Sequence, residues 1–302
     1  MTKQQEIEQL KKEKDAVILA HYYAAPEVQA VADYIGDSFF LSKKAVGLSN
    51  QTIVFCGVSF MGESGKLLNP EKTVLMPDIK ADCPMAHMVT KETVDAARKE
   101  YPDLAVVCYI NSTAEIKSWS DVCVTSANAV TIVRNLPNKH ILFIPDKNLA
   151  HYVAEQVKDK EFVFNDGYCP VHENMKADEI RKLRTEHTDA EVLVHPECSH
   201  AVLESADYIG STSGIIAYAK ESPKKKFIIG TEIGVLYALK EARPDAEFYF
   251  PGTEPVCADM KKITLDNIIE VLKTGRNAMP LPKRRTAEPA QRALTKMLEL
   301  TK

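Results

Sequence analysis

Three of the seven cysteines share a sequence setting that suggests a common chemical task. Cys83, Cys169 and Cys257 each lie in a polar, loop-like segment, and a proline follows two of them. The other four cysteines lack this shared setting and are expected to be thiols that pack in the interior or near the site: Cys56, Cys108, Cys123 and Cys198.

If Cys83, Cys169 and Cys257 lie close together in the folded chain, their thiolates would form a soft ligand set. Structural zinc normally has four protein ligands, whereas thiolates also bind iron-sulfur clusters. A cluster held by three cysteines leaves one iron without a protein ligand, and that iron would be free to act as a Lewis acid on substrate. Zinc with three cysteines and a water molecule is the alternative that the residues leave open.

The elements that must position these cysteines follow a parallel α/β pattern. Short β-branched runs alternate with amphipathic segments that carry Leu, Ala, Ile and charges at helical spacing. We expect strands at 17–20, 53–58, 73–76, 105–110, 140–144, 191–195 and 226–230. The fold class is therefore predicted as α/β.

An internal repeat of about 87 residues organises the polar residues. Three strand ends carry the anchor residues His21, Tyr109 and His195. Polar residues follow two positions after the anchors, at Tyr23, Asn111 and Glu197, and hydroxyls follow seventeen positions after them, at Ser38, Ser126 and Thr212. The recurring cysteines lie 62, 60 and 62 residues beyond the anchors, whereas the other four have unrelated offsets.

This repeat predicts three homologous three-layer αβα domains with parallel sheets, arranged around a pseudo-threefold axis. The expected boundaries are 1–86, 87–172 and 173–258, followed by a C-terminal helical segment at 259–302 that packs back on the body. The carboxyl ends of parallel strands are where ligands bind, so the anchors should line one site.

The chemistry of that site can be outlined from its residue types. We expect Ser38, Ser126 and Thr212 at helix N-termini, where they could bind anions or serve only as N-caps. Glu197 is the best candidate for a general base, with a pKa raised toward neutrality. His172 is either a further donor in the pocket or an ordinary loop histidine.

Composition excludes several classes of protein. The formal net charge is −4 and no Lys/Arg stripe is present, which argues against a nucleic-acid or membrane-surface partner. No apolar run approaches the roughly 20 residues that cross a bilayer, and the charged N-terminal segment is unlike a signal peptide. We therefore expect a cytoplasmic protein with reduced cysteines.

The motifs taken together resemble the quinolinate synthase family of the bacterial NAD pathway. The most specific segments are HPEC at 195–198, CPVH at 169–172 and GTEIG at 230–234, and matching motifs run in order from about residue 15 to 270. The resemblance implies three α/β domains around a pseudo-threefold axis. It also implies a 4Fe-4S cluster bound by Cys83, Cys169 and Cys257.

The resemblance further implies a reaction and its residues. Iminoaspartate and dihydroxyacetone phosphate would condense to quinolinate, with the first substrate supplied by another enzyme. Tyr23 and Glu197 would move protons with support from His195, and His21 and Tyr109 are also expected to be catalytic. The substrate site would be lined by His21, Ser38, Tyr109, Asn111, Ser126, His172, His195, Glu197 and Thr212.

Two other classes of function remain as alternatives. A cluster-bearing hydro-lyase acting on another small polycarboxylate would share the open iron but would not explain the HPEC and GTEIG motifs. A non-enzymatic iron-sulfur or zinc sensor would be expected to carry a basic DNA-reading element, which the charge balance does not offer. The sequence leaves the oligomeric state open.

Overall fold

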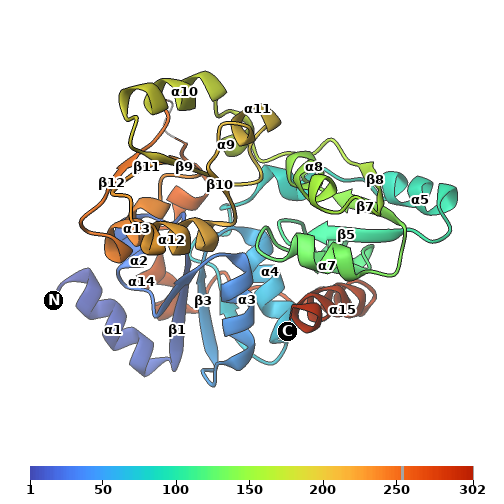
Figure 1. The fold of residues 1–302 in the computed structure, drawn as a ribbon. Helices are drawn as coiled ribbons and strands as arrows, with labels where there is room; N and C mark the ends of the chain where they lie inside the picture. The colour runs from blue at the N-terminus through green and yellow to red at the C-terminus, as the bar shows by residue number, and fades with distance from the viewer. Residues whose placement is uncertain (253–254, 302) are drawn as a thin grey trace.

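The protein contains three parallel β-sheets with the same strand order, as seen in a computed structural model that describes residues 1–252 and 255–301. Each sheet has four strands, and the first strand of each unit pairs with the second and third. Helices cover the sheets (Figure 1). The predicted α/β class with three parallel-sheet units is confirmed, while the threefold axis and the domain boundaries stay predictions.

The first unit begins with a helix whose capping box is formed by Thr2 and Gln5. Its sheet has the order β2(Tyr34–Gly36), β1(Ala16–His21), β3(Thr52–Cys56) and β4(Thr73–Leu75). Its helices are α1(Lys3–Glu13), α2(Pro26–Gln29), α3(Ser38–Gly47) and α4(Ser59–Leu68), followed by the short 3-10 helix η1(Pro84–His87). All six residues of β1 are buried, as expected for a central parallel strand.

The second unit repeats this plan. Its sheet has the order β6(Val122–Val124), β5(Ala105–Tyr109), β7(His140–Ile144) and β8(Glu161–Phe164). Its helices are α5(Lys91–Glu100), α6(Ala114–Ser118), α7(Ala129–Asn135), α8(Lys147–Gln156) and α9(Pro170–Glu173). The strand β5 is buried throughout.

The third unit has the same strand order again. Its sheet consists of β10(Tyr208–Ile209), β9(Glu191–Val194), β11(Lys226–Gly230) and β12(Glu247–Tyr249). Its helices are α10(Ala177–Glu186), α11(His200–Leu203), α12(Thr212–Glu221) and α13(Val235–Ala242), and η2(Met260–Lys262) follows. The predicted third unit and the predicted tail include residues 253–254 and 302, respectively, which lie outside the described residues.

One hydrogen-bonding detail recurs in all three units. Asp33, Asp121 and Asp207 each accept the backbone N–H of a residue fifteen positions earlier in the first strand, at 2.8, 2.7 and 2.8 Å. Each of these aspartates also forms an ion pair with a basic residue from the helix that precedes the first strand of its unit. The recurrence shows that the units share local chemistry as well as strand order.

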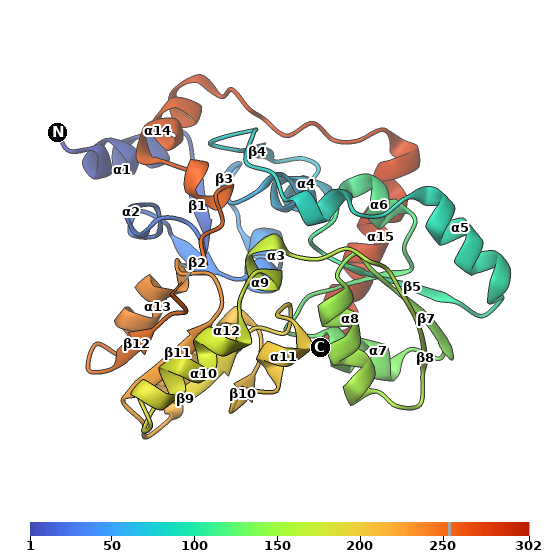
Figure 2. The same ribbon diagram turned by 90° about the horizontal axis from the view of Figure 1, so that it is seen from above.

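Two C-terminal helices pack against the first two units. The helix α14(Leu265–Thr274) lies against α1, and α15(Arg284–Leu300) lies against α4, α6 and β6. Figure 2 shows the segment between them crossing from the side of α1 to the second unit. The apolar face of α15 includes Leu294 and Met297, which are fully buried.

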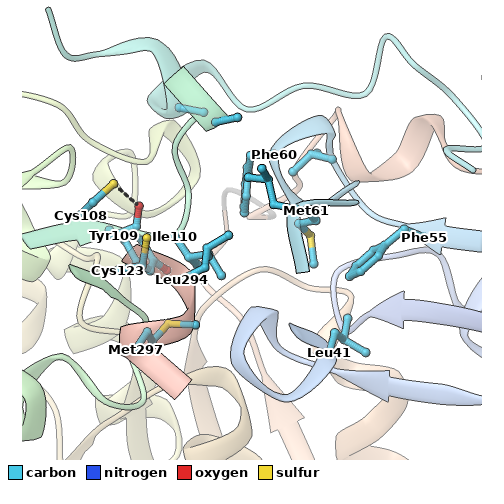
Figure 3. Close-up of a cluster of buried hydrophobic side chains, with 14 of the residues drawn as sticks. Leu41, Phe55, Phe60, Met61, Cys108, Tyr109, Ile110, Cys123, Leu294 and Met297 are labelled. Carbon is cyan, nitrogen blue, oxygen red and sulfur yellow. Dashed lines mark hydrogen bonds between the residues drawn. The ribbon is translucent and has the colours of Figure 1, made fainter. Parts of the chain in front are cut away.

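The first and second units share one apolar core. Figure 3 shows Phe55 and Met61 of the first unit, Ile110 of the second, and Leu294 and Met297 of α15 in this cluster. The third unit has two further clusters, one on each face of its sheet. None of the described helices is long and apolar enough to cross a lipid bilayer.

Candidate active site

A cavity of about 250 Å³ lies where the three units meet. Every side chain that the sequence predicts for the site lines it: His21, Tyr23, Ser38, Cys83, Tyr109, Asn111, Ser126, Cys169, His172, His195, Glu197, Thr212 and Cys257. All three units contribute residues to the cavity lining, and these residues lie at matching offsets from the three anchors. The structure therefore brings the predicted residues together, although their chemical roles need separate argument.

The anchor residues lie at the carboxyl ends of the central strands, beside the cavity. His21 is the last residue of β1 and Tyr109 the last of β5, while His195 directly follows β9. All three side chains are buried. The sheets therefore fix their positions from the carboxyl ends of parallel strands, as expected for α/β proteins.

The hydroxyl residues are not N-caps. Ser38 and Thr212 are the first residues of α3 and α12, and their preceding neighbours Asp37 and Ser211 accept the capping hydrogen bonds. Their own hydroxyls are therefore not used for capping, and that of Thr212 lies 2.9 Å from the Tyr23 hydroxyl. The expectation that Ser126 begins a helix is wrong, because Asn128 is the N-cap residue of α7.

The three predicted cluster cysteines lie at loop ends that face the cavity. Cys83 precedes η1, Cys169 precedes α9, and Cys257 lies in the loop before η2. Burial raises the pKa of all three thiols. A thiolate at Cys257 would further raise the pKa of Cys83, and the charge of Glu197 and then a thiolate at Cys83 would further raise the pKa of Cys169.

This thiol set fits a cationic metal centre. Without a cation, the raised pKa values keep the thiols protonated, and metal binding is the ordinary way to displace such protons. The other four cysteines are fully buried and lie outside the cavity lining: Cys56, Cys108, Cys123 and Cys198.

The two anchor histidines have the same backbone contact. The N–H of Tyr23 donates to His21 Nδ1 at 3.1 Å, and the N–H of Glu197 donates to His195 Nδ1 at 3.3 Å. Because His21 Nδ1 accepts, the proton of its neutral imidazole is on Nε2. His195 Nδ1 also lies 3.2 Å from Glu197 Oε2, and its Nε2 lies 3.2 Å from Ser126 Oγ. Burial lowers the pKa of His21 to about 3 and also lowers that of His195, so both rings are neutral donors near pH 7.

Glu197 lies between two imidazoles. Its Oε2 is 3.1 Å from His172 Nδ1 and 3.2 Å from His195 Nδ1. Burial alone would raise the pKa of this carboxyl, but the neighbouring His172 and His195 outweigh it and lower the pKa. The expectation of a raised pKa for Glu197 is therefore wrong, and the group is a carboxylate at neutral pH.

His172 is a pocket residue and not an ordinary loop histidine. It is fully buried, and its Nδ1 lies 3.2 Å from Cys169 Sγ as well as near Glu197. Its Nε2 is 2.9 Å from Thr231 Oγ1. One ligand atom each from Cys169, His172 and Glu197 lies within 4.8 Å of the others, so these three could also hold a single metal ion.

Tyr23 is held by two threonines. Its hydroxyl lies 2.9 Å from Thr212 Oγ1 and 2.8 Å from Thr231 Oγ1. Burial and the charge of Glu197 raise its pKa well above the ordinary value. The sequence-based prediction missed Thr231, although it lies inside the GTEIG motif that carried the family resemblance.

Three buried polar atoms in the cavity lack partners among the described residues. They are Asn111 Oδ1, Thr125 Oγ1 and Glu197 Oε1, and all three residues line the cavity. Because an unpaired buried polar atom costs roughly 1–3 kcal/mol, such atoms indicate a site that is completed by a ligand. The cavity thus combines neutral imidazoles, hydroxyls, a carboxylate and three thiols.

Comparison with known proteins identifies the family. Residues 5–299 match the family described as quinolinate synthetase A protein. Proteins named quinolinate synthase are similar over nearly their whole lengths. The one from Clostridioides difficile (strain 630) is 50% identical over 297 residues, covering 98% of this chain and 96% of its own. The one from Fusobacterium nucleatum subsp. nucleatum is 51% identical over 294 residues, covering 97% and 98%. The chain therefore belongs to the quinolinate synthetase A protein family, a family of transferase enzymes, as its motifs indicated.

Proposed function

We propose that this enzyme condenses iminoaspartate with dihydroxyacetone phosphate to form quinolinate, phosphate and two waters. The reaction balances without an external oxidant or reductant, because the new ring forms by condensation and elimination. The observation that carries the proposal is the meeting of all predicted polar side chains and three cysteines in one cavity. Family membership supports the same activity.

The cavity offers neutral donors to the anionic groups of these substrates. The Nε2–H group of His21 can bind a carboxylate without the cost of burying a cation. Ser38 and Thr212 add hydroxyls at the N-termini of α3 and α12, where the helix dipoles favour negative charge. Asn111 contributes an amide whose oxygen is unpaired.

Glu197 is the proposed base for the proton transfers of the eliminations. Its carboxylate is ionised at neutral pH, and its free Oε1 can accept a proton inside the cavity. His172 and His195 hold Oε2 and orient the group. Tyr23, with its raised pKa, stays protonated and can donate its proton to a leaving hydroxyl.

Cys83, Cys169 and Cys257 would hold a 4Fe-4S cluster. When bound, such a cluster supplies one iron without a protein ligand, a Lewis acid that can polarise a substrate oxygen or nitrogen. The three thiols come from three different units, so the cofactor would be bound only where the units meet. We expect about four irons and four sulfides per chain after anaerobic purification.

A mononuclear metal is the competing arrangement. Cys169, His172 and Glu197 offer one sulfur, one nitrogen and one oxygen ligand, a set that suits zinc. This alternative leaves Cys83 and Cys257 without a role in metal binding, although both face the same cavity. One zinc and no iron per chain in anaerobically purified protein would favour it.

A direct assay tests the proposed reaction. The anaerobic, iron-loaded protein is mixed with both substrates, and quinolinate is measured by mass spectrometry. We expect quinolinate and phosphate in equal amounts. Protein that holds four irons per chain but forms no quinolinate would refute the activity, and would favour action on a different small polycarboxylate.

A further inference from the structure

The backbone N–H of each proposed ligand cysteine donates to a carboxylate. The Cys83 N–H reaches Asp82 Oδ1 at 2.8 Å. The Cys169 N–H reaches Asp146 Oδ2 at 3.2 Å, more than twenty residues away in sequence. The Cys257 N–H likewise reaches Glu232 Oε1 at 3.0 Å.

Two of these carboxylates occupy equivalent positions in their units. Asp146 follows β7 at the start of α8, and Glu232 follows β11 just before α13. Each lies 37 residues beyond its anchor, since 146 − 109 and 232 − 195 give the same difference. Recurrence at one offset, with one bonding role, argues against a chance contact.

In the first unit, a carboxylate from a different position accepts the cysteine N–H. Its equivalent position is Val58, which has no side-chain acceptor. The next residue, Ser59, donates its hydroxyl to Asp82, and Asp82 accepts the Cys83 N–H. A carboxylate therefore holds the cysteine in all three units, although the residue that supplies it differs.

The buried carboxylates are themselves fixed at both oxygens. Asp146 is fully buried, and its Oδ1 accepts the Leu149 N–H at 2.7 Å. That bond alone would cap α8. Helix capping therefore does not explain why the second oxygen, Oδ2, accepts the Cys169 N–H. The carboxylate joins the start of the helix to the cysteine loop.

Glu232 has a more extensive set of contacts. It is fully buried, its Oε2 accepts the Gly234 N–H at 2.6 Å, and its Oε1 lies 2.9 Å from Lys261 Nζ. Lys261 in turn donates to the carbonyl of Tyr23 at 2.6 Å. Glu232 thus connects the Cys257 loop to the strand end of the first unit that carries Tyr23.

We infer that Asp82, Asp146 and Glu232 are positioning residues that hold the backbones of the three cysteines so that their thiols face one point. The inference rests on the proposed cofactor. Its physical basis is preorganisation: a cysteine whose amide is already bound to a fixed carboxylate loses less conformational freedom when it ligates a metal.

Hydrogen exchange in the iron-free protein tests the contacts directly. Glu232→Gln keeps the shape but turns one acceptor into a donor, which opposes one of the N–H groups that the carboxylate accepts. We expect exchange of the Cys257 amide to rise about tenfold, with the Cys169 amide unchanged. Asp146→Asn should produce the opposite pattern. A general loss of stability would accelerate both amides together.

Iron release from the loaded protein tests the consequence. Glu232→Gln and Asp146→Asn should each lose iron to a chelator about tenfold faster than the wild type. The matched control is Glu247→Gln, which changes an exposed acid of the same unit and should leave both measurements unchanged. Asp82→Asn provides a further variant, because its side chain is 44% exposed and its loss should be tolerated by the fold.

The outcomes separate this inference from the proposed function. Site-specific acceleration of exchange together with faster iron release supports it. Wild-type exchange at Cys169 and Cys257 in the matching variants would overturn it, as would unchanged iron release. Wild-type protein that assembles no iron would overturn the proposed cofactor instead, and exchange measured without iron would still decide whether the carboxylates hold the cysteines.

Discussion

Acidification should destabilise the iron-free chain through His21. The pKa of this buried imidazole falls from 6.5 to about 3, chiefly because burial disfavours the charged ring. Between these values the unfolded chain binds a proton that the folded chain does not, so stability falls as pH falls through this window. Above pH 6.5, His21 has almost no effect on how the unfolding free energy depends on pH.

The magnitude follows from the size of the shift. A pH of 5 lies about 1.5 units below the pKa of 6.5 of the unfolded imidazole, and each unit corresponds to about 1.4 kcal/mol. Lowering the pH from 7 to 5 should therefore cost about 2 kcal/mol from this residue alone. The variant His21→Asn removes the titration but keeps an acceptor near Nδ1 for the Tyr23 N–H.

Urea unfolding at pH 7 and pH 5 measures the effect. The loss of unfolding free energy on acidification should be about 2 kcal/mol smaller in His21→Asn than in the wild type. His200→Asn is the matched control, because it replaces a histidine whose side chain is 64% exposed. Equal pH dependence in His21→Asn and the wild type would refute the account of a neutral, buried imidazole.

Three further outcomes are expected. Cys257→Ser should abolish iron binding while Cys123→Ser keeps it, as measured by iron content, and equal loss in both would contradict the proposed ligand set. Glu197→Gln should retain the iron but lower the rate of quinolinate formation about 10²–10⁴-fold, the usual contribution of a general base; a normal rate would remove it from that role. Leu294→Ala should lower the free energy of unfolding by about 2–5 kcal/mol in denaturant titrations, because its fully buried side chain packs between α15 and the first two units.

The sequence predicted the elements of the site better than its local chemistry. Strand ends and offsets could be predicted because apolar runs and recurring polar residues are visible along the chain. The convergence of His21, Tyr109 and His195 on one cavity followed from parallel-strand geometry. Ser126 shows the limit of such patterns, because α7 begins only after Asn128 and exact helix start points are poorly marked along a sequence.

The pKa of Glu197 shows why three-dimensional contacts were needed. Burial in a pocket predicts a raised value, but His172 and His195 lie near one oxygen and reverse the sign. Thr231 and Glu232 were missed for a similar reason, since their hydrogen-bond partners are far away in sequence. These contacts form only once the chain has folded.

The division of the apolar core has a consequence for motion. The first and second units share one buried cluster with α15, whereas most apolar residues of the third unit lie in two other clusters, with Met260 and Cys257 packing in the shared one. Among the described residues, contacts of the third unit with the first at the cavity include polar ones such as Tyr23 to Thr212 and Lys261 to the Tyr23 carbonyl. We therefore expect a displacement of the third unit to break hydrogen bonds while leaving most of the shared apolar cluster intact.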